Sequence, residues 1–131
     1  MKKLILATLV LFLVGIGTTQ AQGLKIPSTK EIGMANDVLK ILNNTDGLDL
    51  SSDQKSKLEA DNKTFVADVL KTNESKLSDE EKEKAFLGLK NKRTKFLTDL
   101  LGSDLFKKYS GQILKAINPL KSKLGLAALA F

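Results

Sequence analysis

The sequence contains no cysteine, no histidine and no tryptophan, and these absences narrow its chemistry. Without cysteine there is neither a disulfide nor a thiolate nucleophile, and without histidine there is no side chain that ordinarily exchanges a proton near neutral pH. The serine–lysine pairs and the acidic residues fall mostly at helix starts, where helix capping accounts for them. We therefore expect a protein that is not an enzyme and that uses no cofactor.

One stretch superficially resembles a calcium-binding loop. Its oxygen-bearing side chains are Asn44, Asp46 and Asp53. When Gly47 is aligned with the turning glycine of such a loop, Leu42 falls at the first ligand position and Asp53 stands in place of the final bidentate glutamate. We therefore expect this stretch to be a plain helix exit, and we expect no metal site in the chain.

The longest apolar run lies at the N-terminus. Two lysines precede residues 4–17, which are apolar or small, and Thr19 and Ala21 place small side chains where a signal peptidase reads them. The run is shorter than the roughly 20 residues that cross a bilayer. We expect residues 1–21 to be a signal peptide cleaved after Ala21, and the mature protein to be periplasmic in a bacterium or secreted from it.

Three helix-start signals follow a short linker at residues 22–27. Capping boxes begin at Ser28 and Ser51, each with an acidic or amide side chain three residues later, and the segment at Ser78 starts in the same way. We expect Ser103 and Asp104 to cap a further helix. Apolar residues then recur at three-and-four spacing, and no stretch alternates with the period of a strand.

The pattern predicts an all-α fold. The expected helices lie near residues 28–43, 51–72, 78–101 and 103–118. They form one domain, residues 28–118, arranged as a four-helix bundle or as an array of helical hairpins. The expected core is formed by the apolar residues of the helix faces: Val38, Leu42, Leu58, Phe65, Val69, Phe86, Leu89, Phe96, Leu100, Phe106, Tyr109 and Ile113.

Residues 119–131 form an apolar C-terminal segment that begins at a helix-breaking proline. We favour an arrangement in which it packs back onto the bundle and completes the core. The alternative depends on Lys115, Lys121 and Lys123, which lie beside its apolar residues. A basic, apolar segment of this kind can contact a membrane surface or dock on a partner.

Charge is unevenly distributed along the chain. The formal net charge is +6, and residues 85–131 carry nine lysines and arginines against two acids, whereas residues 22–84 are net acidic. Residues 90–95 could contact phosphates. Aromatic side chains for base stacking are scarce, however, and an exported protein seldom meets nucleic acid. We expect this basic run to be a solvated helix face and expect no nucleic-acid partner.

The capping segments also carry a family resemblance. Leu50-Ser-Ser-Asp-Gln54 resembles the Leu-Thr-x-x-Gln motif of the small periplasmic helical proteins of the Spy and CpxP type, and Leu77-Ser-Asp-Glu-Glu81 is a second copy with Glu for Gln. The stretch from Leu101 to Tyr109 is similar to a degenerate third repeat. Serine replaces threonine in both copies, and an additional amphipathic helix precedes the first.

The resemblance implies an ATP-independent periplasmic chaperone or envelope-stress protein, often a homodimer, that holds protein clients on a basic, partly apolar concave face. In this chain we expect the client- or partner-binding side chains to be Lys90, Arg93, Lys107 and Lys108. Clients or other envelope components are the expected partners. The alternative function is that of an interaction or membrane-surface protein that docks through its basic, apolar C-terminal half.

Overall fold

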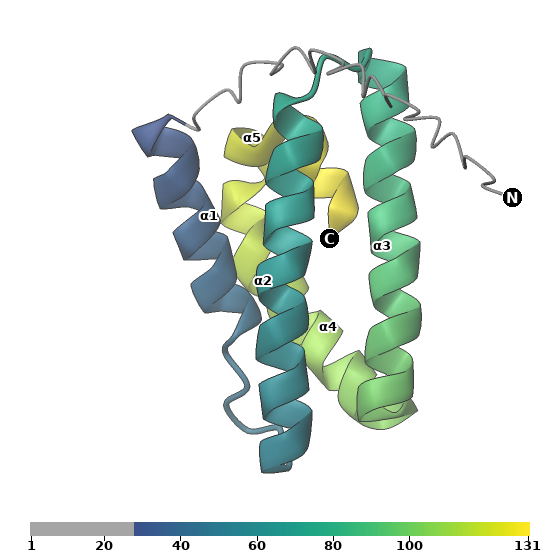
Figure 1. Ribbon diagram of the computed structural model, residues 1–131. Helices are drawn as coiled ribbons and strands as arrows, with labels where there is room; N and C mark the ends of the chain where they lie inside the picture. Colours follow the sequence, from purple (N-terminus) through teal and green to yellow (C-terminus); the bar gives the residue numbers. More distant parts are fainter. Residues whose placement is uncertain (1–27) are drawn as a thin grey trace, which may run out of the picture.

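The computed structural model describes residues 28–131, and no strand occurs among them. Four α-helices form the body of the fold (Figure 1): α1 (Thr29–Leu42), α2 (Ser52–Glu74), α3 (Asp79–Leu101) and α4 (Ser103–Ile117). Three short helical turns follow: η1 (Asn118–Leu120), α5 (Lys121–Leu124) and η2 (Gly125–Ala130). The prediction of an all-α domain is confirmed. The expected signal peptide and linker lie outside the described residues.

Capping boxes start α1, α2 and α3, as the sequence predicts. Ser28, Ser51 and Ser78 are the N-caps, and each exchanges hydrogen bonds with the residue three positions later. The prediction for α4 is wrong, because its N-cap is Gly102 and no side chain caps it. Gly102 has a φ of 78° and also ends α3, so the two helices share one junction residue and Ser103 is already helical.

The helices pack as neighbours along the chain, and the C-terminal segment then returns to the bundle. α2 packs against both α1 and α3, and α4 packs against α1 and α3. The chain turns back after α4, so that the C-terminus lies between α2 and α3 (Figure 1). Ala127 and Ala130 are buried there, and the ring of Phe131 meets that of Phe65 edge-on at 5.2 Å. The favoured arrangement, in which this segment completes the core, is the one observed.

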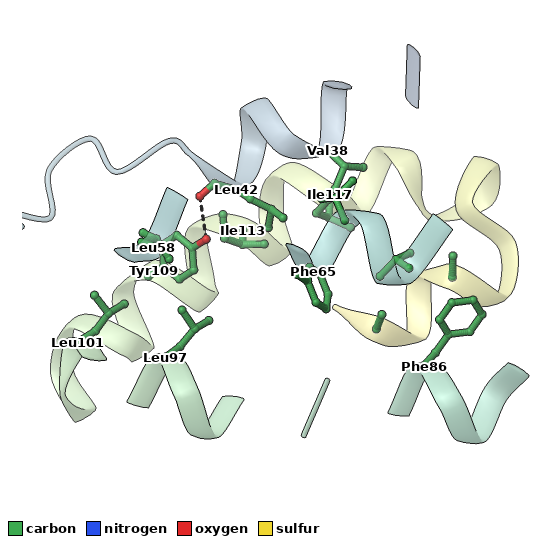
Figure 2. Close-up of a cluster of buried hydrophobic side chains, with 14 of the residues drawn as sticks. Val38, Leu42, Leu58, Phe65, Phe86, Leu97, Leu101, Tyr109, Ile113 and Ile117 are labelled. Atoms are coloured by element: carbon green, nitrogen blue, oxygen red, sulfur yellow. Dashed lines mark hydrogen bonds between the residues drawn. The ribbon is translucent and has the colours of Figure 1, made fainter. Parts of the chain in front are cut away.

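Most of the predicted core residues are buried in one apolar cluster (Figure 2). The prediction is wrong at four positions, which are only half-buried at the edge of the cluster: Leu89, Phe96, Leu100 and Phe106. On α3 the buried face is centred on the row of Arg93 and Leu97, so the apolar residues at 89, 96 and 100 lie to one side of it. Within residues 28–131, no helix has the length and apolarity needed to cross a membrane.

Candidate functional site

Arg93 lies in the middle of α3 on its buried face, with 8% of its surface exposed. Its Nη1 donates to Asp61 Oδ2 at 2.7 Å, and its Nη2 donates to Asn62 Oδ1 at 2.6 Å; both partners belong to α2. Nη2 also contacts Tyr109 Oη of α4 at 3.1 Å. The prediction that Arg93 belongs to an exposed binding surface is therefore wrong, because these partners hold its guanidinium inside the bundle.

The network closes on the backbone carbonyl of Leu42, at the end of α1. Tyr109 Oη donates to this oxygen at 2.7 Å (Figure 2), and Asn62 Nδ2 donates to it at 2.9 Å. Asn62 Nδ2 also donates to Asn43 Oδ1 at 2.7 Å. The last carbonyls of a helix have no partner within the helix. Here the carbonyl of Leu42 accepts side-chain hydrogen bonds from α2 and α4, and Arg93 extends the same network to α3.

Burial opposes ionisation throughout this network. It lowers the pKa of the Arg93 guanidinium, while Tyr109 and Asp61 act in the opposite direction. It raises the pKa of the Asp61 carboxyl, an effect that Arg93 and Lys92 partly offset. An arginine remains protonated at neutral pH even with a lowered pKa, because its ordinary pKa lies far above neutrality. The guanidinium is therefore a buried cation that donates three hydrogen bonds to side-chain oxygens from its five N–H groups.

A groove between α3 and α4 lies against this network, and Arg93 and Tyr109 form part of its floor. Its volume is about 170 Å³. The rest of the lining is mainly apolar, and the C-terminal segment contributes to it: Leu42, Leu97, Phe106, Ile113, Leu114, Ala130 and Phe131. Leu114 is 45% exposed, so an apolar side chain stands uncovered at the edge of the groove. We refer to this feature as the α3–α4 groove.

Two of the predicted basic residues flank the α3–α4 groove, and a third does not. Lys90 lines it. Lys107 does not line it, but it precedes Ser110 by three residues, which places it beside the rim of the groove on α4. Lys108 lies two positions from both Phe106 and Ser110, so helical geometry turns it away. All three lysines are exposed. The predicted set thus separates into Lys90, which lines the groove, Lys107 beside its rim, Lys108 on another face, and the buried Arg93.

The polar partners of Arg93 are the functional-site residues that sequence reasoning missed. Asn62 is fully buried, and it sits on α2 between Leu58 and Phe65, on the apolar face of the helix. Arg93 likewise interrupts the apolar face of α3. Two polar residues on the inward faces of neighbouring helices signal a paired, buried polar contact, because an unpaired one would be strongly destabilising.

The loop after α1 has the geometry of a helix exit. Asn44 Oδ1 accepts from the backbone amide of Asp46 at 3.0 Å, and Gly47 has a φ of 75°. Among the described residues, no three acidic, histidine or cysteine side chains are grouped as a metal ion would require.

Comparison of the chain with protein-family models, with curated proteins and with solved structures finds no match. The resemblance of residues 50–54 and 77–81 to the Spy and CpxP type therefore stays a prediction from a short motif.

Proposed function

We propose that this protein is an exported, chaperone-like binding protein that acts without ATP and holds unfolded client polypeptides at the α3–α4 groove. The observation that carries the proposal is an apolar groove with Leu114 uncovered at its edge and two lysines beside it. Neither Lys90 nor Lys107 has an ion-pair or hydrogen-bond partner within residues 28–131. Their charges are therefore available to a ligand.

The size of the groove sets what a client places in it. A cavity of about 150 Å³ accommodates a benzene molecule. The α3–α4 groove, at about 170 Å³, therefore has room for one aromatic or leucine-sized side chain. Acidic residues next to that side chain would meet Lys90 and Lys107, and charges at such a rim chiefly steer encounter and select partners. A site that binds one side chain and a few neighbouring charges suits transient binding of an unfolded polypeptide.

The family resemblance supports the same proposal. Proteins of the Spy and CpxP type act on unfolded clients in the periplasm, often as homodimers, and the two motif copies at residues 50–54 and 77–81 connect this chain to them. The proposal therefore includes export of a mature chain that begins at Gln22. Mass spectrometry of the protein recovered from the bacterial envelope tests this part, and a protein that retains residues 1–21 contradicts it.

No observation favours the alternative of docking through the C-terminal half. Ala127 and Ala130 are buried against the helices, and Phe131 packs on Phe65. The other apolar side chains of the segment, Leu120, Leu124, Leu126 and Leu129, are half-buried against the core and are thus partly engaged within the protein. Removal of residues 119–131 would not be a clean test of this alternative, because the truncated protein would lose part of its core together with the proposed docking segment.

An aggregation-suppression assay on a thermally unfolding client tests the groove directly. The wild-type protein is expected to suppress aggregation at stoichiometric amounts. The double variant Lys90→Gln/Lys107→Gln should need roughly fivefold more protein, since two exposed charges contribute about 0.5 kcal/mol each. Leu114→Ser should weaken suppression as well.

Lys108→Gln is the matched control, because it removes an exposed charge from the same helix outside the groove. The proposal is overturned by an absence of suppression in molar excess, or by equal losses in Lys107→Gln and Lys108→Gln. Vesicle binding by a wild-type protein that suppresses no aggregation would instead favour the membrane-surface alternative.

A further inference from the structure

A second pocket is lined by residues of α1, of α2 and of the C-terminal segment, including α5. Its volume is about 270 Å³, which is larger than that of the α3–α4 groove. We refer to it as the α1–α2 pocket. Most of its wall is aliphatic, with Met34 and Val38 from α1, Val66 and Val69 from α2, and Leu124 and Ala127 from the C-terminal segment.

The polar part of the α1–α2 pocket holds two lysines, the acid Glu31, and the neutral residues Ser28 and Asn73. Lys30, in the first turn of α1, and Lys123, in α5, both line it. Neither ammonium group has an ion-pair or hydrogen-bond partner in the described part of the chain. The one acid of the lining is Glu31, and its Oε2 accepts from the backbone amide of Ser28 at 2.8 Å in the capping box.

From this combination we infer that the α1–α2 pocket binds a single alkyl carboxylate, that is, the anion of a free fatty acid of medium chain length. The aliphatic wall would take the hydrocarbon chain, and Lys30 and Lys123 would take the carboxylate. A cavity of about 150 Å³ holds benzene, so 270 Å³ has room for a longer chain.

This site is distinct from the α3–α4 groove and would bind a different class of ligand. Phe131 lines both cavities, and the C-terminal segment therefore forms a wall between them. The inference does not depend on client binding, and its test uses a different measurement, so each can fail alone.

Isothermal titration calorimetry with alkyl carboxylates below their micelle concentrations tests the inference on the protein as it folds. Affinity is expected to rise by roughly fourfold for each added methylene, as burial of the chain predicts, and to level off once the chain fills the pocket. Decanoate is also expected to raise the midpoint of thermal unfolding, since it binds the folded state.

Substitutions of single lysines distinguish binding of decanoate in the pocket from nonspecific attraction of an anion to a basic protein. Lys30→Gln and Lys123→Gln should each weaken decanoate binding by roughly two- to fivefold, as expected for partly exposed ion pairs. Lys121→Gln is the matched control, because Lys121 is exposed in the same helix, α5, but does not line the pocket. Ala35→Leu should obstruct the pocket, with circular dichroism used to verify that the variant is folded.

Several outcomes would overturn the inference. These are an absence of decanoate binding, equal affinity for decylammonium, or equal losses in Lys121→Gln and Lys123→Gln. NMR shifts on decanoate addition that fall at Leu114 rather than at Val66 and Val69 would place the ligand in the wrong cavity. Binding to anionic phospholipid vesicles without binding of monomeric decanoate would assign these lysines to a membrane surface instead.

Discussion

The guanidinium of Arg93 lies over the face of the Phe65 ring, with its Cζ 4.4 Å from the ring centroid. A cation within about 6 Å of an aromatic face is attracted by the negative charge of that face, and the attraction is stronger when water is excluded. The edge of the same guanidinium is hydrogen-bonded to Asp61 and Asn62. Arg93 therefore acts as a structural centre, with its face packed on an aromatic residue and its edge matched by oxygen atoms.

Replacement of Arg93 by alanine should accordingly lower the free energy of unfolding by about 2–4 kcal/mol, because the buried Asn62 and Tyr109 lose a charged donor, while Asp61 is 26% exposed and can be hydrated. Urea denaturation followed by circular dichroism measures the change. Lys92→Ala, at the exposed neighbouring position, should stay within about 0.5 kcal/mol of wild type. A loss below about 1 kcal/mol in Arg93→Ala would mean that the network contributes little.

Gln54 makes a second hydrogen bond, outside the capping box, that a glutamate at the same position could not donate. Its Oε1 accepts from Ser51 in the capping box, while its Nε2 donates to the carbonyl of Leu100 near the end of α3 at 3.1 Å. Gln54→Glu should cost about 1–2 kcal/mol of stability, since it loses a donor and places a carboxylate beside a helix C-terminus.

Glu81→Gln is the reciprocal substitution in the second motif copy. Within residues 28–131, Glu81 makes only the capping contacts with Ser78, so an amide can replace it with a smaller effect. Denaturation of both variants at neutral pH compares them. If the two changes were equal, the contact of Gln54 with Leu100 would have no energetic role.

The features of this fold that could be predicted from the sequence are those that depend on residues close together in the chain. Capping boxes join residues three positions apart, so Ser28, Ser51 and Ser78 mark their helices without knowledge of the packing. The partners of Arg93 on α2 lie 31 and 32 residues away in the chain, and only the packing of α2 against α3 brings them together.

The same distinction explains the errors in the predicted core. Phe96 and Leu97 are both apolar, and their side chains point in directions about 100° apart on the helix. Which of them faces inward depends on where α2, α4 and the C-terminal segment meet α3. Leu48 is buried from within a loop, where no periodic pattern marks it.

Leu97→Ala should therefore destabilise the protein more than Phe96→Ala, although phenylalanine is the larger side chain. Leu97 is buried and its truncation should cost about 2–5 kcal/mol, whereas Phe96 is half-buried and should lose roughly half as much. Parallel denaturation curves measure both values. The reverse order would mean that α3 is rotated relative to the arrangement described here.

Ionisation of the Tyr109 hydroxyl should make the stability of the folded protein depend on pH in the alkaline range. Burial raises the pKa of its hydroxyl above the ordinary value, although Arg93 and Asn62 act in the opposite direction. The folded state thus keeps the phenol neutral where the unfolded chain ionises it. The resulting stabilisation is fully present below the unfolded pKa of about 10, and it is lost as pH rises through the folded value.

Ultraviolet absorbance of the tyrosinate measures this directly, because Tyr109 is the sole tyrosine and the chain has no tryptophan. The folded protein should titrate at higher pH than the urea-unfolded protein. Tyr109→Phe should be less stable at neutral pH and lose this contribution to the alkaline decline. Coincident titration of the folded and unfolded protein would contradict the expected shift.

Phe131 distinguishes a C-terminal segment that belongs to the core from one that docks externally. Its edge-on contact with Phe65 at 5.2 Å is of the kind that contributes about 0.5–1.5 kcal/mol beyond the burial of apolar area. Phe131→Ala should therefore lower the free energy of unfolding by about 2 kcal/mol once the lost burial is included. Leu114→Ala, a comparable truncation at an exposed position, should cost less than about 1 kcal/mol. If Phe131→Ala left stability unchanged while abolishing vesicle binding, the segment would be an external anchor rather than part of the core.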